Sequence, residues 1–189
     1  MTRTTNFKVK ALTWHPYLPP VELTDATPEQ LAAMQVTPSS GKVSPYVRTL
    51  AHDPDSYVTR TKLFNDIMYV KGGLDRAERE LGALIASCIN GCTYCASVHA
   101  RRYIELTGDP DTVERIYRFG LHEPESPRVR AIVDFCEALS ISPPSATNGQ
   151  VATLRQQGLS DADILDLAHS TAIFGWANRL MHTLGHSKA

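Results

Sequence analysis

The chain has 189 residues, of which 42% are hydrophobic and 21% are charged, so it has the composition of one or two globular domains rather than of a disordered or fibrous protein. Its 19 lysines and arginines balance 20 aspartates and glutamates, and this formal net charge of −1 argues against nucleic acid as the main partner. No run approaches the roughly 18 apolar residues that span a membrane, and the first residues lack the apolar stretch of a signal peptide. We therefore expect a cytoplasmic protein with no membrane partner.

Residues 1–25 predict an extended N-terminal arm. This segment contains Pro16, Pro19 and Pro20, and proline lacks the N–H group that helices and sheets need. Residues 26–189 show no linker that would separate a second domain, so we expect a single helical domain after the arm.

Helix starts are the clearest local signals along the rest of the chain. Thr27 followed by Pro28 and Gln30 combines an N-cap, a proline in the first turn and a capping-box glutamine. The segment from Asp53 should run to about Val70, where a lysine and two glycines end it. The expected helix starts are Thr27, Ser44, Asp53, Asp75, Cys92, Asp109, Ser126, Thr147 and Ser160.

The last helix, from Ser160 to about Gly185, is apolar around most of its circumference. Such a helix is either central in a bundle or buried against another subunit. Strand signals are weak, because alternating and β-branched runs are few. The sequence therefore predicts an all-α fold.

Three of the four cysteines lie close together, at Cys88, Cys92 and Cys95, and Cys136 lies apart. In a reducing cytosol such a cluster is more often catalytic or metal-binding than a structural disulfide. Cys92 and Cys95 form a C-x-x-C pair at an expected helix start, where free N–H groups and the helix dipole favour a thiolate.

Two further residues fit thiol chemistry with this pair. His99 follows Cys95 by one helical turn, so its imidazole can take a thiol proton or stabilise the thiolate. Glu80 lies on the preceding helix, and a helix hairpin folded at Asn90-Gly91 brings its carboxylate back towards His99. A carboxylate there would hold the imidazole in one tautomer.

These groups are sufficient for thiol redox catalysis. One thiolate attacks a small-molecule hydroperoxide and becomes a sulfenic acid, the second condenses with it to a disulfide, and a dithiol protein or small thiol resets the pair. We assign Cys95 as the attacking residue, because it is paired with His99, and Cys92 as the resolving one. The spacing alone leaves the opposite assignment open.

The pattern Glu80-x11-Cys92-x2-Cys95-x3-His99 resembles the signature of AhpD-like alkylhydroperoxidases of the carboxymuconolactone decarboxylase superfamily. The resemblance extends over residues 60–110, and residues 174–185 resemble the last helix of its "peroxidase-related" branch. It implies an AhpD-like helical bundle that assembles into a homo-oligomer (trimer, hexamer or dimer) with the site near a subunit interface. It also implies a relay from Glu80 through His99 to the cysteine pair, in an antioxidant enzyme that needs no cofactor. Tyr94 stands where the best-studied members have a histidine.

Three alternatives remain open from the sequence. The C-x-x-C pair also suits a thiol–disulfide reductase without peroxidase activity. A decarboxylase-like enzyme on this scaffold would need no redox-active pair. Finally, Cys88, Cys92, Cys95 and His99 could hold a structural zinc ion, although we expect no metal and treat Cys88 and Cys136 as packed thiols.

Overall fold

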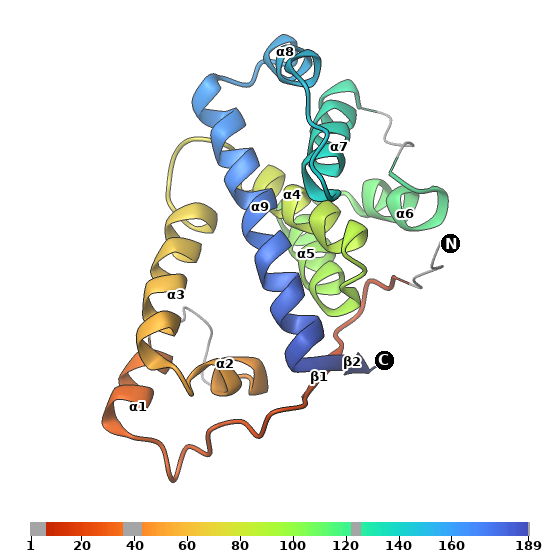
Figure 1. Ribbon diagram of the computed structural model, residues 1–189. Coiled ribbons are helices and arrows are strands. Elements are labelled where there is room, and N and C mark those ends of the chain that lie inside the picture. Colours follow the sequence, from red (N-terminus) through yellow and green to blue (C-terminus); the bar gives the residue numbers. More distant parts are fainter. Residues whose placement is uncertain (1–6, 36–42, 122–125, 189) are drawn as a thin grey trace.

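The computed structural model describes residues 7–35, 43–121 and 126–188, and within these ranges the protein is helical with one small sheet (Figure 1). The predicted all-α class is confirmed. No helix of these ranges is both long and apolar enough to cross a lipid bilayer. The elements are β1 (Thr13–Pro16), α1 (Pro28–Met34), α2 (Pro45–Leu50), α3 (Pro54–Met68), α4 (Arg76–Ile89), α5 (Thr93–Thr107), α6 (Pro110–Phe119), α7 (Pro127–Ser140), α8 (Asn148–Gln156), α9 (Asp161–Leu184) and β2 (Gly185–Lys188).

Each expected helix start is the N-cap residue of an observed helix. Thr27, for example, accepts a hydrogen bond from the Gln30 backbone, and the Gln30 side chain accepts one from the Thr27 backbone. A polar N-cap stabilises a helix by roughly 1 kcal/mol relative to alanine. The end of α3 is less well predicted, because the helix stops at Met68 rather than Val70.

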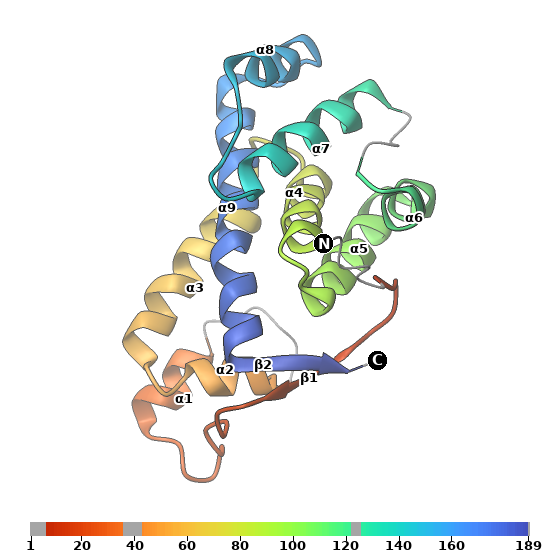
Figure 2. The same cartoon turned by 45° about the vertical axis from the view of Figure 1, so that its right-hand side comes forward.

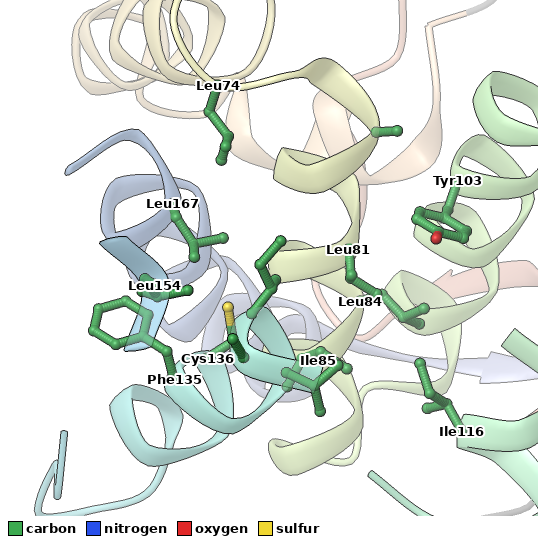
Figure 3. Packing of buried hydrophobic residues seen from close by; sticks show 14 of the residues in the cluster. Leu74, Leu81, Leu84, Ile85, Tyr103, Ile116, Phe135, Cys136, Leu154 and Leu167 are labelled. Atoms are coloured by element: carbon green, nitrogen blue, oxygen red, sulfur yellow. The ribbon is translucent and has the colours of Figure 1, made fainter. Parts of the chain in front are cut away.

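Helix α4 lies at the centre of the molecule, packed against α5, α7 and α9 (Figure 1). Its residues 79–87 are all buried, and Figure 3 shows its Leu81, Leu84 and Ile85 among side chains from the surrounding helices. Close packing depends on a small residue, since a Cβ on Gly82 would lie 2.7 Å from the Thr171 hydroxyl of α9.

Within this chain, helix α9 is not enclosed on all sides, and the predicted alternative of burial against another subunit stays a prediction. It packs against α3, α4 and α7, but its Leu165 and Trp176 side chains are 57% and 44% exposed. The helix at the centre of this chain is therefore α4, where small residues such as Gly82 let neighbouring helices approach closely.

A short antiparallel sheet joins the two ends of the chain, and the sequence did not predict it. Strand β1, inside the expected arm, pairs with β2 directly after α9 (Figure 2). Trp14 of β1 is buried, its indole N–H donates to the Met181 carbonyl at 3.2 Å, and its ring packs in one cluster with Cys92 and Cys95. The sheet thus places an aromatic side chain against the cysteine pair.

Candidate active site

The cysteine pair lies at the turn between α4 and α5. Helix α4 ends at the C-cap Asn90, Gly91 turns the chain with a φ of 69°, and Cys92 is the N-cap of α5. The Cys92 backbone N–H donates to the Ser87 carbonyl at 2.8 Å, which closes the turn. The Cys92 and Cys95 sulfur atoms lie 2.7 Å apart and both are buried. The hairpin predicted at Asn90-Gly91 is therefore observed, and the first turn of α5 after it brings the two sulfurs into contact.

The surroundings shift the pKa values of the two thiols in opposite directions. The hydrogen bond between the two thiols, followed by the first-turn N–H groups and the Asn178 amide, lowers the pKa of Cys92 even though burial acts against it. The same hydrogen bond, together with burial, raises the pKa of Cys95 well above its ordinary value. These opposite pKa directions favour Cys92 over Cys95 as the thiolate of the reduced pair, whereas the position of His99 one turn after Cys95 favours Cys95.

His99 and Glu80 form a buried pair beside the cysteines. His99 Nδ1 lies 2.5 Å from Glu80 Oε2, and Arg76 donates to Glu80 Oε1 through Nε at 3.0 Å. Burial alone would raise the pKa of Glu80, but His99 and Arg76 hold it below its ordinary value. The ionised carboxylate pairs with His99 Nδ1, which leaves Nε2 as the ring nitrogen that can exchange a proton with another group. The ring edge packs on Phe174, with 4.1 Å between ring centres.

A pocket of about 210 Å³ opens beside this group. Cys95, His99 and Glu80 line it, whereas Cys92 lies outside its lining and contributes to a much smaller cavity near Trp14. A small molecule in this pocket therefore meets Cys95 before Cys92. The other lining residues are Tyr46, Arg60, Phe64, Tyr69, Tyr94, Val98, Arg102, Phe174, Ala177 and Met181.

Asn178 of α9 is a site residue that the sequence analysis missed. It is completely buried, donates to the Ser87 hydroxyl at 3.3 Å and accepts from the Asn90 amide at 3.2 Å. Its amide also stabilises negative charge on both Cys92 and Cys95. The sequence signal that could have identified it is an asparagine within a mostly apolar helix. A buried side-chain amide needs hydrogen-bond partners, so an asparagine at such a position indicates a polar contact inside the protein.

The described residues offer no group of three or more histidine, cysteine or acidic side chains that could hold a metal ion. Cys88 packs against the main hydrophobic core, and burial raises its pKa. The geometry therefore gives no support to the zinc alternative. Tyr94 lines the pocket, and burial raises the pKa of its phenol, so it can donate a hydrogen bond but is not a base at neutral pH.

Comparison with known proteins identifies chains with a similar fold. Residues 54–138 match the model of the carboxymuconolactone decarboxylase family. A peroxidase-related protein from Ralstonia eutropha JMP134, described as an alkylhydroperoxidase AhpD core, is 28% identical, with a TM-score of 0.77 over 89% of this chain and 90% of the other. A peroxidase-related protein from Silicibacter sp. TM1040 is 26% identical, with a TM-score of 0.74 over 92% and 94% of the two chains.

The debrominase Bmp8 shares the fold, with a TM-score of 0.73 over 89% of this chain and 90% of its own, at 22% identity. No curated protein matches the sequence.

Proposed function

Because the chain belongs to the AhpD-like carboxymuconolactone decarboxylase superfamily, we propose that it is a cysteine-dependent alkylhydroperoxidase that reduces organic hydroperoxides in antioxidant defence. The observation that carries this proposal is the contact between the Cys92 and Cys95 sulfurs beside a pocket that Cys95 shares with His99. Two sulfurs this close need only a small movement to reach the bond length of a disulfide, about 2.05 Å.

The resting pair holds one proton and one negative charge. His99 takes the proton that the pair gives up, and the Glu80 carboxylate stabilises the resulting imidazolium. The remaining proton lies between the sulfurs and passes from Cys95 to Cys92 when a hydroperoxide enters the pocket. This transfer makes the sulfur that lines the pocket the nucleophile.

Cys95 then attacks the terminal oxygen of the hydroperoxide. A sulfur–oxygen bond forms as the oxygen–oxygen bond breaks, and the alkoxide takes the proton from Cys92 and leaves as the alcohol. The Cys92 thiolate attacks the Cys95 sulfenic acid, a disulfide forms, and the released hydroxide takes the proton from His99 to become water. Both electrons come from the sulfur pair, and an external dithiol returns the disulfide to two thiols by exchange.

A single-turnover experiment tests these roles. Reduced protein is mixed with cumene hydroperoxide in the absence of a recycling dithiol, and we expect one Cys92–Cys95 disulfide for each hydroperoxide consumed. Cys95→Ser should consume none. Cys92→Ser should stop at the Cys95 sulfenic acid, which dimedone traps. Cys136→Ser is the matched control, because Cys136 lies in the core, where burial raises its pKa to about 12.

Peroxidase activity is the wrong assignment if wild-type protein consumes no hydroperoxide even with dithiothreitol as recycler. Disulfide exchange with a dithiol substrate under the same conditions would then identify a thiol–disulfide reductase. Decarboxylation of a lactone acid by a protein lacking both cysteines would instead identify a decarboxylase.

A further inference from the structure

Arg60 of α3 is a cation in the pocket wall without an acidic partner. Its buried Nε has no hydrogen-bond partner, and its guanidinium carbon lies 4.8 Å and 5.6 Å from the ring centres of Phe64 and Trp176. The other arginine of the pocket, Arg102, is paired with Glu105 at 2.9 Å. Within the described part of the chain, no carboxylate forms an ion pair with Arg60.

Tyr46 of α2, which also lines this pocket, carries a second unpaired polar atom. Its hydroxyl is buried and has no hydrogen-bond partner. Burial raises the pKa of Tyr46, with Arg60 nearby acting in the opposite direction, so the phenol stays protonated and remains a donor. A buried hydrogen-bond donor that has no acceptor lowers the stability of the folded protein. Among the described residues, neither Arg60 Nε nor the Tyr46 hydroxyl therefore has an acceptor.

The acceptor that fits both groups is an anion. A guanidinium presents a planar fork of N–H donors that matches a carboxylate, and a phenol adds one further donor. The carboxylate that lines this pocket, Glu80, is already held by Arg76 and His99. No other carboxylate lines the pocket in the part of the chain that the structure describes, so a ligand is the source of the anion that fits both groups.

We propose that the pocket selects substrates that carry a carboxylate, which binds Arg60 and Tyr46 while the reacting group meets Cys95. Combined with the proposed function, on which this inference rests, the substrate class is a carboxylate-bearing organic hydroperoxide. The carboxylate is unchanged in the reaction, and only the oxygen–oxygen bond is reduced.

The size and lining of the pocket limit the rest of the substrate. Its volume of about 210 Å³ is below the roughly 300–1,000 Å³ typical of sites for drug-sized ligands. Between the polar ends the walls are apolar, with Phe64, Phe174 and Met181 among them. The body that joins the carboxylate to the hydroperoxide is therefore a single ring or a short chain.

A binding experiment tests the anion site without any turnover. Calorimetry on Cys95→Ser protein compares 4-isopropylbenzoate with 4-isopropylbenzamide, and we expect the acid to bind about tenfold more tightly. Adding Arg60→Gln should abolish this preference, and Arg60→Lys should restore part of it because the charge returns without the fork. Lys62→Gln is the matched control, since it removes a charge from the exposed face of the same helix. Circular dichroism verifies that each variant is folded.

A kinetic experiment then connects the anion site to catalysis. The substrates are cumene hydroperoxide with a para-carboxylate and the methyl ester of the same compound. Wild-type protein should prefer the acid about tenfold in kcat/KM, and Arg60→Gln should lower this ratio to about one, whereas the exposed control Lys62→Gln should leave it at about tenfold.

The experiments can refute each of the two proposals independently of the other. If neither hydroperoxide is consumed, the proposed function is wrong, and the benzoate measurement still decides whether the pocket recognises a carboxylate. If benzoate binds no more tightly than the amide, or if Arg60→Gln leaves the preference intact, the carboxylate site is refuted whether or not the protein is a peroxidase.

Discussion

Replacing Arg79 with methionine should destabilise the protein strongly, because this buried side chain joins three helices. Its guanidinium donates to the carbonyls of Ile67 at 3.0 Å, Val70 at 3.3 Å and Gly72 at 2.7 Å, and to Asp166 Oδ2 at 3.0 Å. These contacts tie the end of α3 and the following turn to α4 and α9. Helices α3, α4 and α9 also wall the candidate active site, so the same contacts hold its pocket together.

The magnitude follows from the four hydrogen bonds. At a net value of about 1 kcal/mol each, their loss costs about 4 kcal/mol. A second estimate comes from buried ion pairs, where removing one member lowers the free energy of unfolding by about 3–5 kcal/mol. Asp166 is 33% exposed and regains water, which favours the lower part of this range. We therefore expect Arg79→Met to lower the free energy of unfolding by about 3–4 kcal/mol.

Urea denaturation at neutral pH, followed by circular dichroism, measures this difference. Lys62→Met is the control, because Lys62 forms an exposed pair with Asp66 whose loss costs less than about 1 kcal/mol. An Arg79→Met protein that loses no more stability than this control, with an unchanged denaturant slope, would refute the reasoning.

Three other measurements test the site and its surroundings. The ultraviolet absorbance of the thiolate should titrate at a lower pH in Cys95→Ser, which retains Cys92, than in Cys92→Ser; the reverse order would place the resting charge on Cys95. The folded-state pKa of Glu80 is depressed, so its ionised form stabilises the protein above its ordinary pKa of 4.5 and this contribution is lost as pH falls further. Glu80→Gln should therefore lose about 1–3 kcal/mol in thermal or urea unfolding at neutral pH, with a smaller loss in acid; a constant difference across pH would contradict this. Gly185→Ala should cost about 1–3 kcal/mol and shift Trp14 fluorescence to the red, since the added Cβ would lie 2.3 Å from the Trp14 ring; an unchanged spectrum and stability would argue against this close packing.

Helix boundaries were predictable because capping is a local interaction. The residues that satisfy the free N–H groups of α1 are Thr27 and Gln30, three positions apart in the sequence. The end of α3 is different, because the carbonyls of Ile67 and Val70 bond to Arg79 on the next helix. A helix end held by a tertiary contact leaves no comparable local signal.

The same distinction applies to the candidate site. Cys92, Cys95 and His99 lie on one helix, so their spacing predicts that they share a face, and one tight turn brings Glu80 back to His99. The helix start also predicts a lowered pKa for the cysteine pair, but it does not predict which of the two thiols has the lower pKa. The lower pKa of Cys92 depends partly on Asn178, which is 86 positions away from Cys92 and reaches the sulfurs only because α9 packs on α4.

From the sequence alone, the all-α class, the helix starts and the C-x-x-C pair with its histidine and glutamate could be derived, because each depends on residues a few turns apart. Tertiary structure alone decided the β1–β2 pairing, the opposite pKa directions of Cys92 and Cys95 and the presence of Arg60 and Tyr46 in one pocket. The physical reason is that burial and electrostatic environment are set by every group packed around a site, whatever its distance along the chain.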